Sequence, residues 1–203
     1  MKQSFIFSLI FFTLLSCSKK EVDKQSSCSA NDWEYSYIAS PLTEFFFQEG
    51  SYWILMNDLT NSVDSIRISH IETGCEAVYL YQGYGINWEY YKIFYKSYPS
   101  GYSYYDMIES DYIMRNRHPS KYPTVQGWIL YSSADISHIP WHPILYDSLV
   151  VNNHTFYHVQ MSQHPFQESD HVYMAKGIGI IRRDVLDSNG IQTWNLIRWK
   201  IYK

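Results

Sequence analysis

The chain has 203 residues, which suits one domain after a leader is set aside, because domains commonly hold about 100 to 200 residues. Its formal net charge is -4, from 16 basic and 20 acidic residues. This balance gives no strong positive field for attracting nucleic-acid phosphates or an anionic membrane, so we expect no nucleic-acid partner.

Residues 1–16 have the layout of a secretory signal peptide. Lys2 precedes an uncharged run from Phe5 to Leu15, and the small residue Ser16 stands just before Cys17. A bilayer-spanning helix takes about 20 residues, so this run is too short and predicts a signal segment instead.

The residues Leu14-Leu15-Ser16-Cys17 resemble the lipobox of bacterial lipoproteins. This resemblance implies cleavage after Ser16, a diacylglycerol on the Cys17 thiol and a further acyl chain, such as palmitate, on the new amine. Two such chains hold a protein durably at a membrane. By analogy with lipoprotein sorting, Ser18 implies the outer membrane, with the periplasmic or surface face left open. The alternative is an ordinary secretory leader followed by an incidental cysteine.

Residues 17–32 are predicted to form the lipidated N-terminus and a polar, flexible tether, and residues 33–203 a single β-rich domain. With Cys17 lipidated, Cys28 and Cys75 remain. An even pair in an exported protein favours a disulfide, which would stabilise the fold by about 3 to 4 kcal/mol in the chain-entropy model. Two unpaired buried thiols are the alternative.

The domain is rich in Tyr, Ile, Val, Trp and Phe, which favour strands. A hairpin is predicted from strands over 51–56 and 65–71, in which Ile66, Ile68 and His70 share one face. Further strands are expected over 77–82 and 88–98, then a hairpin of 148–151 and 154–161 around Asn152-Asn153, and a last hairpin of 171–182 and 192–202. In the last strand, Asn195, Ile197, Trp199 and Ile201 are expected opposite Trp194, Leu196, Arg198 and Lys200. Helix is expected only as a short piece begun over 41–48 and a loosely spaced segment over 105–115.

Two stretches resemble uncharacterised lipoproteins of the Bacteroidetes type: Gly50-Ser51-Tyr52-Trp53 with Asp64-Ser65-Ile66, and Val172-Tyr173-Met174-Ala175-Lys176-Gly177-Ile178-Gly179-Ile180-Ile181. The resemblance implies a mainly β fold, with a single antiparallel, strongly curved sheet or half-barrel similar to lipoprotein carrier proteins and one or two short helices. It brings no assigned function.

The pair Gly177 and Gly179 does not open a dinucleotide site, because Arg182 stands where a third glycine is needed and no helix follows. We expect these glycines to permit a bend or a close backbone approach in a curved strand.

Metal binding and catalysis are not expected. His154 and His158 lie about 13 Å apart if they share a strand, and His138 and His142 flank a non-helical stretch, so neither pair forms a ready metal site. No serine lies in a Gly-x-Ser-x-Gly elbow. A paired-carboxylate site would need Asp106, Glu109 and Asp111 to approach one another, although solvated surface acids explain them equally well.

Tyrosine is concentrated in one region, with 11 residues between Tyr79 and Tyr112. Flat rings with polar edges can stack on sugars or line a groove, so we consider a ligand platform. The alternative is that tyrosine simply suits both faces of a sheet. The platform would consist of Tyr90, Tyr91, Tyr102, Tyr104 and Tyr105.

Together these features predict a non-enzymatic lipoprotein of the outer membrane, attached through Cys17 and acting as a binding or structural module without a cofactor. Two alternatives stay open. One is a carrier that holds a lipid or other apolar ligand in the concave face of the sheet, and the other is a glycan-binding surface protein with exposed aromatic residues.

Overall fold

The computed structural model describes residues 34–79, 85–101, 103–109, 112–116, 128–132, 143–164 and 167–203. In these ranges the chain forms one sheet of 12 strands and one short 3-10 helix. The elements are β1 Glu34–Ser36, η1 Ser40–Phe45, β2 Tyr52–Asn57, β3 Val63–Tyr79, β4 Gly85–Tyr98, β5 Ser103–Glu109, β6 Tyr112–Asn116, β7 Trp128–Ser132, β8 Ile144–Val151, β9 His154–His164, β10 Gln167–Ala175, β11 Gly179–Asp187 and β12 Gly190–Lys200.

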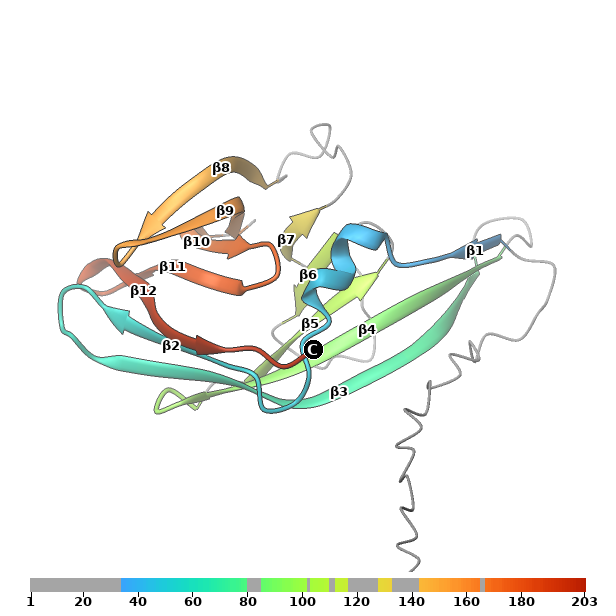
Figure 1. The fold of residues 1–203 in the computed structure, drawn as a ribbon, viewed down its shortest axis with the longest axis horizontal. Helices are drawn as coiled ribbons and strands as arrows, with labels where there is room; N and C mark the ends of the chain where they lie inside the picture. Colours follow the sequence, from blue (N-terminus) through green and yellow to red (C-terminus); the bar gives the residue numbers. More distant parts are fainter. Residues whose placement is uncertain are drawn as a thin grey trace, which may run out of the picture.

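The sheet is a strongly curled half-barrel, which confirms the predicted fold class. Its strand order is β7-β6-β5-β4-β3-β2-β12-β11-β10-β9-β8, with antiparallel pairs throughout and β1 added in parallel to β4 (Figure 1). The curl brings β7 next to β9. There the Gln160 amide donates to the Ser132 carbonyl at 2.7 Å, and the Ser132 backbone N–H donates to Gln160 Oε1 at 2.8 Å.

The turn chemistry of the predicted hairpins is confirmed. Strands β2 and β3 pair across residues 58–62, and β8 and β9 pair around Asn152 and Asn153, whose φ angles are 47° and 63°. Asparagine tolerates positive φ better than other residues with a side chain, which suits it to such a two-residue connection.

The prediction of a helix over 105–115 is wrong, because this segment forms the hairpin of β5 and β6. Ile108 and Ile113 face each other across the two strands at 0% and 1% exposure. This cross-strand burial outweighs the loose helical spacing. The short helix begun over 41–48 is confirmed as η1, with Pro41 in its first turn.

Two β-bulges change the faces that simple alternation predicts. The register between β3 and β4 shifts between Ile68 and His70, so His70 pairs with Phe94 and is exposed, unlike buried Ile66 and Ile68. A second shift follows Leu196 in β12. As a result, Leu196 pairs with buried Leu55 and Trp199 pairs with buried Trp53. The expectation that Trp199 and Leu196 lie on opposite faces is therefore wrong, because an extra residue at a bulge reverses the alternation beyond it.

The expected single strand over 171–182 is two strands, β10 and β11, joined by a tight turn. Gly177 and Gly179 take φ angles of 73° and 90° there. The close approach expected of these glycines is confirmed, since a Cβ on Gly179 would lie 3.1 Å from Trp53 and 3.2 Å from Phe47.

The interior of the half-barrel is filled by aliphatic and aromatic side chains next to η1. Leu42 and Phe45 of η1 are 0% and 1% exposed and close this end of the sheet, near the C-terminus (Figure 1). Ring contacts then lead inward from Phe45 to Phe47 at 5.9 Å between centroids, and from Phe47 to Trp53 at 5.3 Å. The chain of rings continues to Tyr95 at 5.9 Å and on to Tyr104 at 4.9 Å. Much of the aromatic content therefore serves as core packing.

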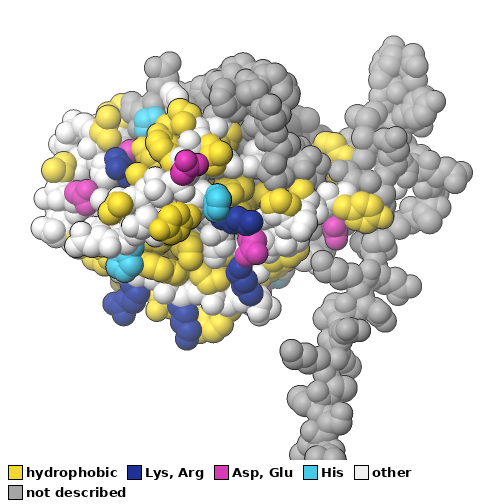
Figure 2. Space-filling view, turned by 45° about the horizontal axis from the view of Figure 1, so that its top comes forward, with side chains coloured by type: hydrophobic (Ala, Val, Ile, Leu, Met, Phe, Trp, Pro, Cys, Tyr) yellow, Lys and Arg dark blue, Asp and Glu magenta, His cyan; other side chains and the backbone are white. Residues whose placement is uncertain are grey.

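The surface carries mixed charge. On the face shown in Figure 2, lysine and arginine lie among acidic, apolar and uncharged side chains. Within the described ranges, no helix has the length and apolarity needed to cross a membrane.

Candidate functional site

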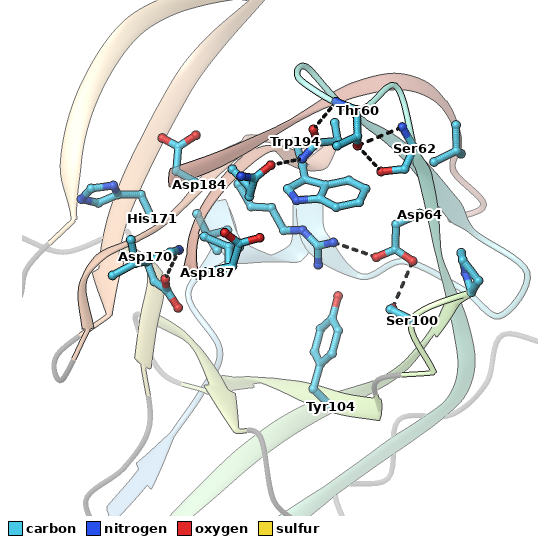
Figure 3. A pocket seen from close by; sticks show the side chains of 18 of the residues that line it. Thr60, Ser62, Asp64, Ser100, Tyr104, Asp170, His171, Asp184, Asp187 and Trp194 are labelled. Atoms are coloured by element: carbon cyan, nitrogen blue, oxygen red, sulfur yellow. Dashed lines mark hydrogen bonds and ion pairs between the residues drawn. The ribbon is translucent and has the colours of Figure 1, made fainter. Parts of the chain in front are cut away.

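A cavity of about 890 Å³ opens at the end of the half-barrel away from η1 (Figure 3). The turns between β2 and β3, between β4 and β5 and between β11 and β12 gather at this end (Figure 1). The start of β10 completes the wall. Small-molecule sites commonly have volumes of about 300 to 1,000 Å³, so this cavity has the size of a ligand pocket. We call it the mouth pocket.

An ion pair between half-buried Arg183 and buried Asp64 forms one wall of the mouth pocket. Arg183 Nη2 lies 2.7 Å from Asp64 Oδ2, and the two side chains are 19% and 2% exposed. The hydroxyl of Ser100 donates to Asp64 Oδ1 at 3.1 Å. Among the described residues, Arg183 Nε is buried and has no hydrogen-bond partner. Asp64 therefore holds the guanidinium through one nitrogen, and its other N–H groups can donate to a ligand.

Beside this ion pair, β12 supplies an aromatic ring and an amide. The Arg183 guanidinium lies over the Trp194 ring at 5.1 Å from its centroid. Asn57 Nδ2 donates to Gln192 Oε1 at 3.1 Å, while Asn57 Oδ1 accepts from the backbone N–H groups of Leu59 and Thr60 at 2.9 Å each. Because the Gln192 oxygen is taken by Asn57, its NH₂ group is the part that remains for a ligand.

The other acids of the mouth pocket already act as local acceptors. Asp170 is 4% exposed and accepts from the Leu186 backbone N–H at 3.0 Å. Asp187 accepts from the Asn189 backbone N–H at 2.7 Å and so stabilises the turn between β11 and β12. These carboxylates shape the wall and make it acidic.

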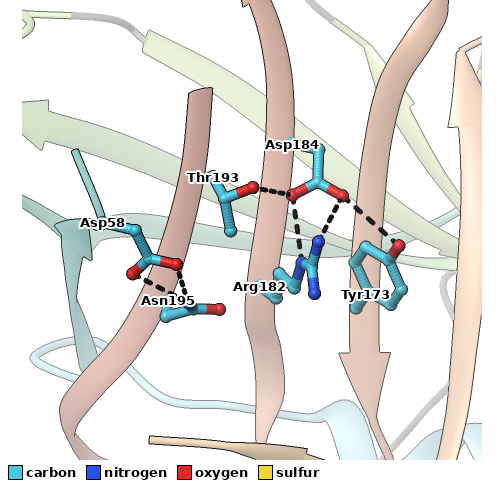
Figure 4. A network of polar contacts seen from close by, with 6 residues as sticks. All are labelled: Asp58, Tyr173, Arg182, Asp184, Thr193 and Asn195. Atoms are coloured by element: carbon cyan, nitrogen blue, oxygen red, sulfur yellow. Dashed lines mark hydrogen bonds and ion pairs between the residues drawn. The ribbon is translucent and has the colours of Figure 1, made fainter. Parts of the chain in front are cut away.

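Asp184 also borders the mouth pocket (Figure 3), and its carboxylate belongs to a polar network on the outer face of the sheet (Figure 4). Arg182 binds it with two hydrogen bonds of 3.0 Å, and Thr193 and Tyr173 donate to it at 2.9 and 3.3 Å. Burial raises the pKa of Tyr173, and the Asp184 charge raises it further. Burial lowers the pKa of Arg182, but its hydrogen bonds to Asp184 outweigh this effect and raise the pKa overall. The network links β10, β11 and β12 through Tyr173, Asp184 and Thr193.

The structure divides the tyrosines that the sequence suggested as one platform. Tyr91 and Tyr104 face the interior, where Tyr91 donates to the Phe47 carbonyl at 2.9 Å and Tyr104 stacks on Tyr95. Tyr90 and Tyr105 belong to the opposite face. There Tyr90 contacts Lys92, whose Nζ lies 4.2 Å from the ring, and Tyr105 contacts Phe94 at 5.5 Å. Tyr102 lies outside the described residues. Within the described part of the chain, only Tyr104 of the five lines the mouth pocket.

The remaining candidates are placed as follows. His154 and His158 lie on β9, away from the mouth pocket, and Asp106 is a buried residue of β5. Across the described ranges, no three His, Cys, Asp or Glu residues are arranged to hold a metal ion. Cys75 lies on β3 opposite Glu89. Five other predicted positions lie outside the described residues, so the lipid anchor and the Cys28–Cys75 disulfide stay predictions: Cys17, Cys28, Asp111, His138 and His142.

Sequence reasoning missed Arg183, Asp64 and Gln192 as site residues. Asp64 and Arg183 are 119 positions apart and meet only because β3 and β11 curl around the same end. A signal was present in β11, where Arg183 occupies an inward position between Ile181 and Val185. A charged residue at such a position is rarely buried without a specific partner.

Comparison with known protein families, with curated proteins and with solved structures gives no match.

Proposed function

We propose that this chain is a non-catalytic binding module of the bacterial cell envelope, anchored through Cys17, and that its ligand enters the mouth pocket. The observation that carries the proposal is the contrast between the two ends of the half-barrel. At one end Leu42 and Phe45 fill the interior, and the hollow of about 530 Å³ bordered by Glu44 is smaller and more open, whereas the other end holds the cavity of about 890 Å³. Interiors of soluble domains are close-packed, so an opening of this size is typical of a binding site.

The lining favours a small ligand with both polar and apolar groups over a lipid, because side chains such as Val172, Val185 and Trp194 lie beside its polar groups. The wall combines the Arg183–Asp64 ion pair with the amide of Gln192 and several hydroxyl groups, including that of Ser100. An acyl chain placed there would offer no acceptor to the remaining donors of Arg183 and Gln192, which is unfavourable. The apolar interior suited to a lipid lies beyond Tyr104 and is occupied by packed side chains.

A binding role also agrees with how the acids of the mouth pocket are used. Asp64 accepts from Arg183 and Ser100, and Asp170 accepts from a backbone N–H. Carboxylates held in this way act as fixed walls and acceptors. Such a preorganised wall recognises a ligand at little entropic cost.

The lipid anchor and the outer-membrane location rest on the lipobox-like residues ending in Cys17. A tether over 17–32 would hold the domain close to the membrane while leaving the mouth pocket free to collect a ligand. Mass spectrometry of the chain purified from bacterial membranes should find acyl chains on Cys17, and Cys17→Ser should release it from the membrane fraction. An unmodified Cys17 in membrane-bound chain contradicts the anchor.

A thermal-shift screen of the full-length chain in detergent tests the binding role. At a concentration 100 times its Kd, a ligand specific to the folded state adds about 2.7 kcal/mol, which corresponds to a Tm increase of roughly 5 to 10 °C for a chain of this size. Small hydrophilic compounds should produce this shift, and phospholipids should not. Trp194→Ala should abolish the shift, whereas Tyr157→Ala, at an exposed ring outside the mouth pocket, should retain it. An increase of Tm with phospholipids alone refutes the proposal. The absence of an increase with every compound refutes it as well.

A further inference from the structure

We propose that the ligand of the mouth pocket is a neutral saccharide, recognised chiefly by Arg183, Asp64, Gln192 and Trp194. This inference rests on the binding role proposed above and names the chemical class of the ligand. It depends on which donors, acceptors and charges the described residues leave available.

The mouth pocket offers donors and acceptors side by side. Asp64 binds one nitrogen of the Arg183 guanidinium, and Asn57 takes the Gln192 oxygen, so donors remain on both side chains. The Asp64 carboxylate lies 2.7 Å from Arg183 Nη2 and keeps lone pairs for a further contact. A hydroxyl group both donates and accepts, so neighbouring hydroxyls on one ring satisfy this mixed wall better than a group that only accepts.

The charge of the wall argues against a charged ligand. An anion bound to the guanidinium nitrogens that Asp64 does not contact would still lie beside the Asp64 carboxylate, which repels it. Asp170 adds further negative charge to the wall. A cation would have to compete with Arg183 for Asp64, and displacing Arg183 would leave its half-buried guanidinium without that partner, which is unfavourable. A neutral ligand avoids both costs.

The aromatic residues provide the apolar part of the contact. Trp194 lies in the wall next to the ion pair, and the labelled Tyr104 ring points into the cavity from the opposite side (Figure 3). Sugar rings combine apolar C–H faces with polar edges, so an aromatic ring and planar polar side chains together match them. The cavity has room for a mono- or disaccharide.

Neighbouring arginines provide a matched pair of variants. Arg183→Lys keeps a positive charge for Asp64 but removes the planar fork with its several donors, so affinity for a saccharide should fall about tenfold. Arg182→Lys makes the same change on the outer face, where Arg182 binds Asp184 with two hydrogen bonds. It should lower the thermal midpoint and leave the affinity within about twofold of the wild type. Gln192→Glu, which keeps the acceptor for Asn57 and loses the NH₂ donor, is a second test of the same wall.

The experiment is calorimetric titration of the full-length chain in a detergent without a sugar headgroup. The panel contains glucose, galactose, mannose, N-acetylglucosamine, cellobiose and maltose as neutral saccharides, glucuronic acid and glucosamine as charged ones, and hexadecanol as an uncharged apolar ligand. Binding of a neutral saccharide, weakened about tenfold by Arg183→Lys but not by Arg182→Lys, is the expected result. Binding restricted to a charged or apolar compound overturns the saccharide inference and leaves the binding role standing. Equal affinity in the two lysine variants also overturns it, and absence of binding by every compound removes both proposals.

Discussion

Gly179→Ala should be one of the most destabilising single-methyl additions in this fold, for two separate reasons. Gly179 has a φ of +90°, where an L side chain is strained by about 1 to 3 kcal/mol. The added Cβ would also lie 3.1 Å from Trp53 Cζ2 and 3.2 Å from Phe47 Cε2. Neither ring has room to move away, because Trp53 and Phe47 are each 1% exposed. The Trp53 indole N–H also donates to the Ile178 carbonyl at 2.6 Å.

Overpacking of this kind costs about 1 to 3 kcal/mol in a well-packed core, so the two effects together give about 2 to 6 kcal/mol. Gly190→Ala is the matched control. Its φ is +108°, but nothing lies within 4 Å of the added Cβ, so only the backbone cost of about 1 to 3 kcal/mol applies.

Urea unfolding of both variants measures the difference as a shift of the midpoint at constant slope. We expect Gly179→Ala to lose about 1 to 3 kcal/mol more than Gly190→Ala. Equal losses would refute the argument that Trp53 and Phe47 pack rigidly against this turn.

Further predictions concern pH, a turn and the disulfide. Burial raises the pKa of Tyr91 above 10.0, so its contribution to stability is fully present below about pH 10 and is lost as pH rises through the folded-state value. In Tyr91→Phe, the unfolding free energy should therefore decrease less steeply with pH above pH 10. Near neutral pH the variant should be about 1 kcal/mol less stable, because it loses the hydrogen bond to the Phe47 carbonyl. An unchanged slope above pH 10 contradicts this. Asn153→Ala should cost about 1 kcal/mol in urea unfolding because its φ is 63°, and a neutral result would argue against the tight turn. Cys28 and Cys75 should resist thiol labelling in the unfolded, unreduced chain, and labelling of either without reductant rules out the bridge.

The hairpins could be predicted from the sequence because their signals are local. Asn152-Asn153 specifies a turn by its own backbone preference, and the alternation on either side fixes the two strands. The bulges after Ile68 and Leu196 carry no comparable local signal. Each moves later side chains to the other face, which is why the faces of His70 and Trp199 were predicted incorrectly.

The candidate site could not be predicted in the same way because it is assembled by curvature. Tyrosine enrichment correctly marks an aromatic region, yet the register of β4 and β5 sends Tyr91 and Tyr104 inward and Tyr90 and Tyr105 outward. The ion pair of Asp64 and Arg183 depends on the closure of the sheet around one end. No spacing within a single strand encodes that contact.

The central claim is that the open end of the half-barrel holds the ligand, and a crystal structure with the tightest-binding saccharide tests it most directly. We expect a sugar ring in the mouth pocket, in contact with Trp194 and within hydrogen-bond distance of Arg183. A ligand bound to the outer face of the sheet, or at the end closed by Phe45, would contradict this account.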